Sequence, residues 1–318
     1  MKVLIVKKKD SCWPFVEEQT SSLAKIGIES VYHLIEGKGM MAYVEDIAKL
    51  VRDIRHVQPD VVHAHYGMSG FYTCIVVRLI GLAHKLPVVI TFHGSDINNP
   101  KVRKLSQGAI KMAAFNIFVS PKMTERVSVG ENSAVIPCGI DWDDWPEISK
   151  EEARKQMGLE QGKKYVLFSS DFQTEVKNPK LAKEAISKLN GVELIELKGY
   201  TRVEVNMLMH AVDVCLMTSK TEGSPQFIKE AMACGCPIVT TRVGDTDYVI
   251  GNTDGCYFAD DNAEDCASQL QKALAFAEKH NRTNGRKRIE ELGYSNDVVA
   301  AKIRDIYFRL VYGVRCKV

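Results

Sequence analysis

The stretch "SKTEGSPQFIKEAMACGCPIVTTRVGD", from Ser219 to Asp245, joins two short apolar runs by a helical segment. The run "VCLMTS" (214–219) ends where the stretch begins, and "PIVTT" (237–241) lies near its end. Such short, continuous apolar runs are typical of strands buried on both faces of a parallel sheet. Between them, Ser224 is a favourable N-cap and Pro225 suits the first position of a helix, which a glycine then ends. The order strand, helix, strand predicts a βαβ unit.

The same alternation continues on both sides of this stretch. The strand-like runs of the first half are "KVLIV" (2–6), "SVYHLI" (30–35), "DVVHAH" (60–65), "PVVITFH" (87–93), "NIFVS" (116–120) and "AVIPCG" (134–139). The other runs of the second half are "YVLFSS" (165–170), "VELIELKG" (192–199) and "CYFA" (256–259). Helical patterns separate most of these runs. The chain therefore predicts an α/β fold with two doubly wound parallel sheets.

A polar stretch with glycine and proline, "GIDWDDWPEISKEEARKQMGLEQGKK" (139–164), interrupts the alternation and predicts a linker. We therefore predict an N-terminal domain over 1–147, a C-terminal domain over 148–294 and a final helix within 295–318. Ligands of such sheets bind at the carboxyl ends of the strands. Two sheets of this kind predict a small-molecule site in a cleft between the domains.

The composition is that of an ordinary globular protein. Of the 318 residues 45% are hydrophobic and 26% charged, and a net charge of +2 argues against a dedicated nucleic-acid binder. The nine cysteines form no C-x-x-C pair, which indicates reduced thiols rather than a disulfide framework or a zinc site. Neither a signal peptide nor an apolar run of about 18 residues occurs, so we expect a cytoplasmic protein.

One motif suggests a different enzyme class. "GKGMMA" (37–42) matches the dinucleotide fingerprint G-x-G-x-x-A, and an oxidoreductase that uses a nicotinamide cofactor is therefore an alternative. The motif follows the second strand, however, whereas this fingerprint normally occupies the first βα turn. A tight turn is the simpler interpretation. The P-loop pattern G-x-x-x-x-G-K-[ST] does not occur, so P-loop nucleotide hydrolysis is unsupported.

Two kinds of residue cluster are possible metal ligands. "DWD" (141–143) and "DTD" (245–247) both have the D-x-D spacing that can hold a divalent ion. His63 and His65 alternate on one strand and share a face, and His93 ends another strand. We favour solvated turns for both acidic pairs and core or wall positions for the histidines, and we predict no metal.

The opening stretch also contains two glutamates with different settings. Glu222 lies in the loop at the carboxyl end of a strand, just ahead of a helix whose first amides, at 223–226, would attract phosphates. Glu230 lies ~8 Å further along the helix axis, among apolar neighbours. A carboxylate beside packed surface needs donors, which two ribose hydroxyls would supply. The structural alternative is a solvated Glu230 beside Lys229, with Glu222 as a capping residue.

These motifs resemble those of a known enzyme family. "TEGSPQFIKEAMACGCPIVTTRVGD" (221–245) resembles the glutamate-pair signature of the family-four retaining glycosyltransferases (glycosyl transferases group 1), which have the GT-B fold. "HGSD" (93–96) is similar to the family's His-Gly segment, and "VKNP" (176–179) to the segment with its phosphate-binding lysine. "VIPCGIDWDDW" (135–145) resembles the interdomain segment "IPNGVD", with Cys138 in place of asparagine. The resemblance covers nearly the whole chain and implies two Rossmann-like domains that face each other across a cleft, with the final helix crossing back onto the first.

The resemblance implies three catalytic residues. Glu222 would bind the donor sugar near its 3- and 4-hydroxyls, His93 would lie under the sugar near its 6-hydroxyl, and Lys177 would neutralise the diphosphate. The donor substrate would be a nucleoside diphosphate sugar, and no cofactor is implied. Negative charge grows on the leaving diphosphate as the sugar becomes oxocarbenium-like, and Lys177 together with the helix N-terminus would stabilise it without a metal. Retention is explained in this family by attack on the same face as the leaving phosphate, which takes the acceptor's proton.

The resemblance also implies a set of donor-binding residues. Glu230 would hold the ribose hydroxyls. Backbone groups of Gly223, Ser224 and Pro225 would line the sugar and the distal phosphate, although proline offers only its carbonyl and ring.

The chain departs from the family pattern at two places. The family usually has an arginine a few residues before the lysine, but "SSDFQTEVK" has none, and Arg202 would be the substitute cation for the donor. The family often has a Gly-Gly turn after the first strand, but this chain has "KKKDSCWPF", in which Lys8, Lys9 and Ser11 could line the cleft instead.

The leading interpretation is a retaining glycosyltransferase that builds a surface or exported glycan from the cytoplasmic side, on a glycan or lipid-linked acceptor. The departures leave a non-catalytic relative, which binds a nucleotide sugar or a partner transferase, as the second interpretation.

The segment "NNPKVRKLSQGAIKMAAFNIF" (98–118) places a basic edge beside an apolar edge on a helix. It predicts either peripheral docking on the inner membrane face or an ordinary half-buried helix.

Overall fold

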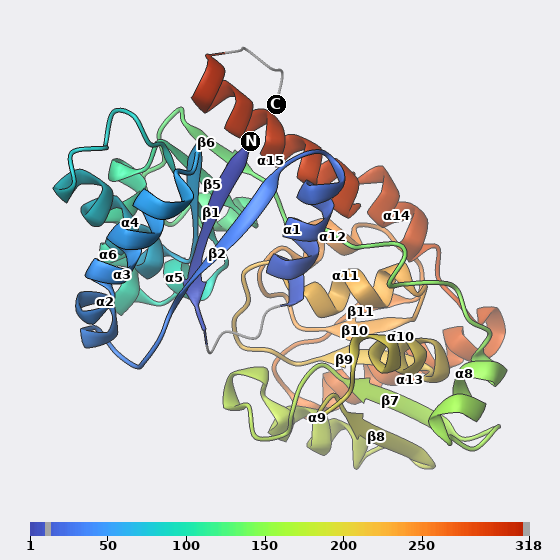
Figure 1. Cartoon of the computed structure of the whole chain (residues 1–318). Coiled ribbons are helices and arrows are strands. Elements are labelled where there is room, and N and C mark those ends of the chain that lie inside the picture. The colour runs from blue at the N-terminus through green and yellow to red at the C-terminus, as the bar shows by residue number, and fades with distance from the viewer. Residues whose placement is uncertain (10–13, 314–318) are drawn as a thin grey trace. The chain divides into compact units, whose positions relative to one another are not determined.

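The computed structural model describes residues 1–9 and 14–313. These residues form two compact units (Figure 1). Unit 1 comprises residues 1–139 and the described chain from Asn296 onward, and unit 2 comprises Ile140–Ser295.

The division between the units falls after residue 139, whereas the sequence placed it after residue 147. The reason is that Ile140 and Trp145, both within the polar stretch, are fully buried in the core of unit 2. Of the residues predicted to line the site after the first strand, Ser11 lies outside the described ranges.

The sheet of unit 1 has six parallel strands in the order β2-β1-β3-β4-β5-β6. They are β1 (Lys2–Lys8), β2 (Glu29–Ile35), β3 (Val61–His65), β4 (Val88–Phe92), β5 (Phe115–Phe118) and β6 (Ser133–Val135). Strands β3 and β4 are buried at every position, which explains their unbroken apolar sequences. The strand order reverses between β1 and β3, and the carboxyl ends at such a switch point are where doubly wound sheets bind ligands.

Helices cover both faces of this sheet. Alternate residues of β1 enter different cores, with Leu4 in one cluster and Val3 and Ile5 in the other. The helices are α1 (Pro14–Lys25), α2 (Met41–Glu45), α3 (Ile47–Val57), α4 (Gly67–Leu79), α5 (Ser95–Asn98), α6 (Pro100–Met112), α7 (Pro121–Thr124) and α15 (Asn296–Tyr312). The final helix α15 packs beside α1 and contributes Ile303 and Tyr307 to the second cluster, so it belongs to unit 1 (Figure 1).

The sheet of unit 2 has five parallel strands in the order β11-β10-β9-β7-β8. They are β7 (Lys164–Phe168), β8 (Val192–Glu196), β9 (Val214–Met217), β10 (Ile238–Thr240) and β11 (Cys256–Phe258). Here the order reverses between β7 and β9. The surrounding elements are α8 (Lys150–Met157), the 3₁₀ turn η1 (Glu175–Lys177), α9 (Pro179–Ile186), α10 (Arg202–Ala211), α11 (Gln226–Ala233), α12 (Thr246–Ile250), α13 (Ala263–His280) and α14 (Gly285–Glu291). The prediction of two Rossmann-like parallel sheets is confirmed.

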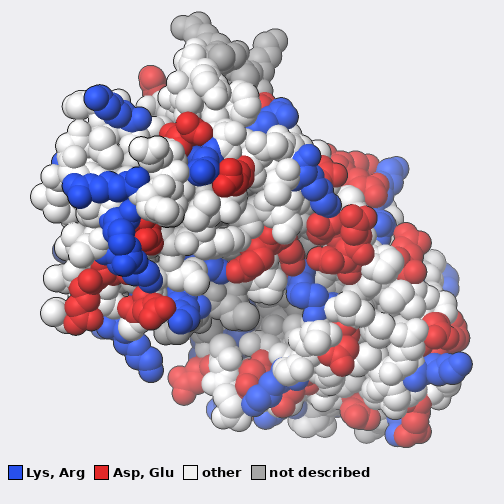
Figure 2. All heavy atoms as spheres, viewed as in Figure 1, with Lys and Arg blue, Asp and Glu red and all other residues white. Residues whose placement is uncertain are grey.

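The helix proposed for membrane docking is largely used in packing. Within α6, Ala109 is fully buried in the core, and Val102, Leu105 and Met112 on the same edge are half-buried. This agrees with the structural alternative. No described helix is long and apolar enough to cross a membrane. Figure 2 shows basic and acidic side chains interspersed on the visible face of each unit, as the small net charge of +2 leads one to expect.

Candidate functional site

An ion pair lies at the switch point of unit 2. Lys177 ends η1, after β7, and Glu222 lies in the loop after β9; the lysine Nζ is 2.5 Å from the glutamate Oε1. The backbone joins the same two segments, because the N–H of Lys220 donates to the carbonyl of Val176 at 2.9 Å. Both charged side chains keep some contact with solvent, at 25% and 14% exposure. The structure therefore brings two of the predicted catalytic residues together at the carboxyl ends of β7 and β9.

The helix after this loop starts one residue later than the sequence predicted. Helix α11 begins at Gln226, and Pro225 is its N-cap, because ψ of Pro225 is 118° and keeps that residue out of the helix. The Oγ atom of Ser224 is therefore not a capping group; it is buried and has no hydrogen-bond partner among the described residues. A Cβ atom on Gly244 would lie 2.6 Å from the carbonyl oxygen of Gly223, so the loop after β10 packs closely here. The predicted donor-binding backbone thus lies at a tightly packed helix start.

Glu230 is buried within α11 and paired with an arginine. Its Oε1 accepts a hydrogen bond from Nη1 of Arg202, the first residue of α10, at 2.6 Å. Glu230 is 4% exposed and Lys229 is fully buried, so the alternative of a solvated Glu230 is wrong. The Arg202 guanidinium also lies 4.9 Å from the centre of the Trp145 ring, which holds it by a cation–π contact. Arg202 is therefore placed against the carboxylate predicted to bind ribose.

The acidic pairs differ from each other. The N–H of Asp143 donates to Oδ1 of Asp141 at 3.1 Å, which agrees with the predicted turn. The expectation of a solvated turn is wrong for Asp245, which is 1% exposed and directly precedes α12. Within residues 1–9 and 14–313, no group of three or more His, Cys, Asp or Glu side chains is arranged to hold a metal ion.

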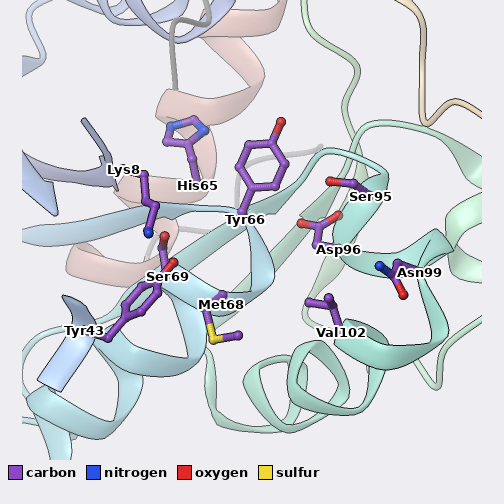
Figure 3. A pocket seen from close by; sticks show the side chains of 10 residues that line it. All are labelled: Lys8, Tyr43, His65, Tyr66, Met68, Ser69, Ser95, Asp96, Asn99 and Val102. Atoms are coloured by element: carbon purple, nitrogen blue, oxygen red, sulfur yellow. The ribbon is translucent and has the colours of Figure 1, made fainter. Parts of the chain in front are cut away.

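A pocket of about 510 Å³ lies in unit 1 where β1, β3 and β4 end, beside the switch point of that sheet (Figure 3). It is lined by Lys8, Tyr43, His65, Tyr66, Met68, Ser69, Ser95, Asp96, Asn99 and Val102. Lys8 donates to the carbonyl of Gly37 at 2.9 Å, and its Nζ lies 5.3 Å from the centre of the Tyr43 ring. Figure 3 shows Lys8, Tyr43 and Ser69 on one side of the pocket and Ser95, Asp96 and Asn99 on the other. A cation, hydroxyls and aromatic faces in one pocket suit a polar ligand with a ring.

Asp96 and Tyr66 give this pocket a fixed shape. The buried Asp96 carboxylate accepts hydrogen bonds from the N–H groups of Gly67, Gly94 and His93 at 3.0, 2.9 and 3.3 Å, and so ties the loop after β3 to the loop after β4. Burial raises the pKa of Asp96 to about 6, although these N–H donors act to lower it. Tyr66 has φ 73° and ψ 146°, a conformation that residues other than glycine rarely adopt. Such backbone strain occurs mainly at functional sites.

Three histidines form a stack beside this pocket, and His65 lines it. His63 is hydrogen-bonded at Nδ1 to the Tyr307 hydroxyl at 2.5 Å and at Nε2 to Thr91 Oγ1 at 2.7 Å. His65 Nδ1 lies 3.0 Å from His93 Nε2, and the His65 ring stacks on both other imidazoles, with centroids 4.6 and 5.3 Å away. Burial lowers the pKa of His63 to about 3 and that of His65 well below its usual value, so both rings are neutral. His63 bonds Tyr307 and Thr91, and His65 bonds His93, which agrees with the predicted core or wall positions of the histidines.

Both halves of the chain match family models. Residues 163–275 match the model described as "Glycosyl transferases group 1", and residues 22–144 match that described as "Glycosyltransferase Family 4". The chain belongs to the family-four glycosyltransferases. Its recognition from the glutamate pair, the "HGSD" segment and the "VKNP" segment is thereby confirmed.

Several curated proteins are similar to this chain. A Bacillus subtilis protein named as a teichuronic acid biosynthesis glycosyltransferase, TuaC, is 26% identical over 227 residues, which are 62% of this chain and 57% of that protein. A D-inositol 3-phosphate glycosyltransferase of Mycobacterium marinum is 24% identical over 58% of this chain and 49% of its own length. The N-acetyl-alpha-D-glucosaminyl L-malate synthase of Bacillus anthracis is 23% identical over 78% of this chain and 74% of its own. The chain thus spans about half the length of the first two relatives.

Solved structures share the fold. A sucrose-phosphate synthase from Thermosynechococcus elongatus has a TM-score of 0.84 at 14% identity, covering 99% of this chain and 100% of that one. Anabaena HepE, in a structure with UDP and glucose, has a TM-score of 0.75 at 15% identity, covering 96% and 98%. These matches confirm the GT-B assignment made from the motifs.

The sequence indicated parts of the site but not its pairings. Lys177, Glu222, Glu230 and Arg202 were all singled out, yet the two ion pairs join residues 45 and 28 positions apart and had no local signal. Tyr66 was missed altogether. Its position directly after a fully buried strand is the signal that could have found it, because ligands bind where such strands end.

Proposed function

We propose that this glycosyltransferase moves a sugar from a nucleoside diphosphate sugar to a glycan or lipid-linked acceptor, with retention and without a resident metal. The role would lie in the synthesis of a surface or exported polysaccharide, on the cytoplasmic side of the membrane. The observation that carries the proposal is the presence of two ion pairs at α11 and the loop before it, Lys177 with Glu222 and Arg202 with Glu230.

The Arg202–Glu230 pair supports the nucleoside part of the donor. Arg202 donates a hydrogen bond to Oε1 of Glu230 and so orients the buried carboxylate. The other carboxylate oxygen can then accept hydrogen bonds from the ribose hydroxyls. Because Arg202 already fixes the direction of the Glu230 carboxylate, little free energy is needed to reorient this side chain when the ribose binds. Arg202 is thus assigned to hold Glu230, in addition to its predicted part in donor binding.

The Lys177–Glu222 pair supports the reacting part of the donor. When the diphosphate enters, its negative charge competes with Glu222 for the Lys177 ammonium. The released Glu222 carboxylate can then accept hydrogen bonds from the sugar hydroxyls. Lys177 and the backbone N–H groups of Gly223 and Ser224, which directly precede α11, would then lie near the phosphate on which negative charge grows. Pro225 has no N–H, so it would line the sugar only with its carbonyl and ring. Same-face attack, with the leaving phosphate taking the acceptor's proton, would give retention.

The pocket of unit 1 supports the acceptor part. Lys8 supplies a positive charge beside Tyr43, and Ser69, Ser95 and Asn99 supply neutral polar groups. The names of two relatives specify anionic acceptors, inositol 3-phosphate and malate. We infer that the acceptor of this chain also carries a negative charge, such as the phosphate of a lipid-linked glycan. Peripheral membrane contact through α6 stays a prediction, which vesicle co-sedimentation at low and high salt would test.

A thermal-shift panel of nucleotide sugars, followed by a transfer assay with the stabilising donor, tests the proposal. We expect at least one nucleoside diphosphate sugar to raise the melting temperature and to be consumed in the presence of an acceptor. Stabilisation without consumption of the donor, over a broad set of acceptors, would favour the non-catalytic relative. A panel without any stabilising nucleotide would contradict the proposal.

A further inference from the structure

His65 and His93 share a single hydrogen bond whose direction can be assigned. His65 Nδ1 and His93 Nε2 are 3.0 Å apart, so one of these atoms carries the proton and the other accepts it. Both directions are compatible with the distance. The choice between them decides which edge of His93 offers a donor, because a neutral imidazole has one N–H.

The surroundings of His65 favour one direction. His65 is 1% exposed, and its Nε2 atom is buried without a hydrogen-bond partner among the described residues. If His65 carried its proton on Nε2, that N–H would be buried and unsatisfied, which proteins rarely tolerate. With the proton on Nδ1 only a lone pair is left without a partner, and the Nδ1–H donates to His93.

The His93 ring is held in place by other contacts. Its centroid lies 5.0 Å from the ring centroid of Phe15 and 4.6 Å from that of Tyr66, and its backbone N–H donates to Asp96. The remaining ring nitrogen, Nδ1, lies 3.9 Å from Sγ of Cys138, a long and weak contact that a stronger acceptor could replace.

We propose that His65 is a positioning residue, which donates from Nδ1–H to His93 Nε2 and thereby makes His93 an Nδ1–H donor toward a substrate oxygen. The substrate part rests on the proposed function together with the family resemblance, which implies that His93 lies near the 6-hydroxyl of the donor sugar. In this role His93 recognises an oxygen as an acceptor and is not a proton-abstracting base.

The direct test is the tautomer of His93, read by long-range ¹⁵N–¹H NMR of the ring nitrogens in the full chain labelled at histidine. We expect His93 to carry its proton on Nδ1 in the unmodified protein and to lose this preference in His65→Leu. His65→Asn places an amide N–H near the position of the former Nδ1–H, and this variant should restore the preference of His93 for the Nδ1–H tautomer. A His93 protonated on Nε2 in the unmodified protein would overturn the proposal, and so would an unchanged tautomer in a folded His65→Leu protein.

Tyr307→Phe is the matched control. Tyr307 is as buried as His65, and its hydroxyl bonds the far end of the histidine stack, at His63. We expect this variant to lower the melting temperature while His93 keeps its tautomer. If Tyr307→Phe changed the tautomer as much as His65→Leu does, the effect would be one of packing, and His65 would have no positioning role.

Kinetics separate this inference from the proposed function. We expect His65→Leu to raise KM for the nucleotide sugar about threefold to tenfold, the range of one hydrogen bond, with His65→Asn recovering most of it. Affinity for the nucleoside diphosphate alone should not change, because it lacks the sugar. Failure of every nucleotide sugar to bind would defeat the proposed function and leave the tautomer result standing. An unchanged KM together with an Nδ1–H His93 would overturn the substrate contact assigned to His93.

Discussion

The two units have sheets of the same kind but load their switch points with different chemistry. The sheet of unit 2 carries opposite charges in contact, Lys177 with Glu222 and, beside them on α10 and α11, Arg202 with Glu230. The sheet of unit 1 carries tyrosines and stacked histidines, of which burial keeps His63 and His65 neutral. Lys8 and Asp96 lie beside them, and Asp96 is held by backbone N–H groups. Paired charges can be redirected to a charged ligand. The hydrogen-bonded histidines and Asp96 of unit 1 hold side chains and loops in fixed directions instead. This contrast suggests that unit 2 binds the diphosphate and that unit 1 orients a polar ligand.

The largest effect is expected from Lys177→Ala. In the proposed function Lys177 faces the phosphate charge that grows in the transition state. Its loss should therefore lower kcat about a hundredfold to a thousandfold while donor binding changes less. Steady-state kinetics with the donor found in the panel measures both. If turnover stayed within about twofold while Arg202→Ala abolished it, Arg202 and not Lys177 would be the cation of the phosphate site.

Glu230→Ala should weaken nucleoside diphosphate binding about tenfold to a hundredfold. A hydrogen bond to a charged group contributes roughly 1.5–3 kcal/mol, and the variant also leaves Arg202 without its carboxylate. Calorimetric titration is the measurement, with Glu193→Ala, an exposed glutamate of β8, as the control. Equal affinities for both variants and the unmodified protein would remove the ribose role of Glu230.

In unit 1, the destabilisation caused by Asp96→Ala is expected to depend on pH. An acid whose pKa is raised in the folded state stabilises the fold most at low pH, and this contribution is lost as pH rises through about 6. Between pH 4.5 and 7.5 the destabilisation caused by Asp96→Ala should therefore shrink by about 2 kcal/mol. Chemical unfolding at the two pH values measures it. A destabilisation that grows with pH would mean that the three N–H donors hold Asp96 ionised.

The smallest effect is expected from metal removal. If Lys177 and the start of α11 supply the positive potential at the phosphate, activity in excess chelator should equal activity without it. Initial rates with and without chelator decide this. Loss of activity that magnesium or manganese restores would show that the charge pairs of unit 2 do not suffice.

The fold could be predicted because its signals are local. Buried runs such as "VCLMTS" and "PVVITFH" alternate with helical patterns, and this period does not depend on distant residues. The domain division was less accurate, since Trp145 lies in a polar stretch and only tertiary packing shows that it belongs to the core of unit 2. The start of α11 was misplaced for a local reason, the extended backbone of Pro225.

The candidate site was predictable in its residues and not in its contacts. Motif resemblance singled out Glu222, Glu230 and Lys177, but the partner of each carboxylate comes from a different loop or helix. His65 was placed on a strand face with His63, yet the direction of its bond to His93 depends on burial of one ring nitrogen. Such properties arise only when the strands are assembled.

Hydrogen–deuterium exchange with UDP, GDP and ADP in turn tests the central claim, that unit 2 holds the nucleoside diphosphate at its switch point. With the nucleotide that binds, we expect slower exchange in the segments 175–178 and 219–230 of unit 2. The strand ends around Tyr66 and Asp96 should keep their exchange rates, because the nucleotide alone lacks a sugar. Protection confined to the pocket of unit 1, or binding without protection at either segment of unit 2, would contradict the division of labour between the two sheets.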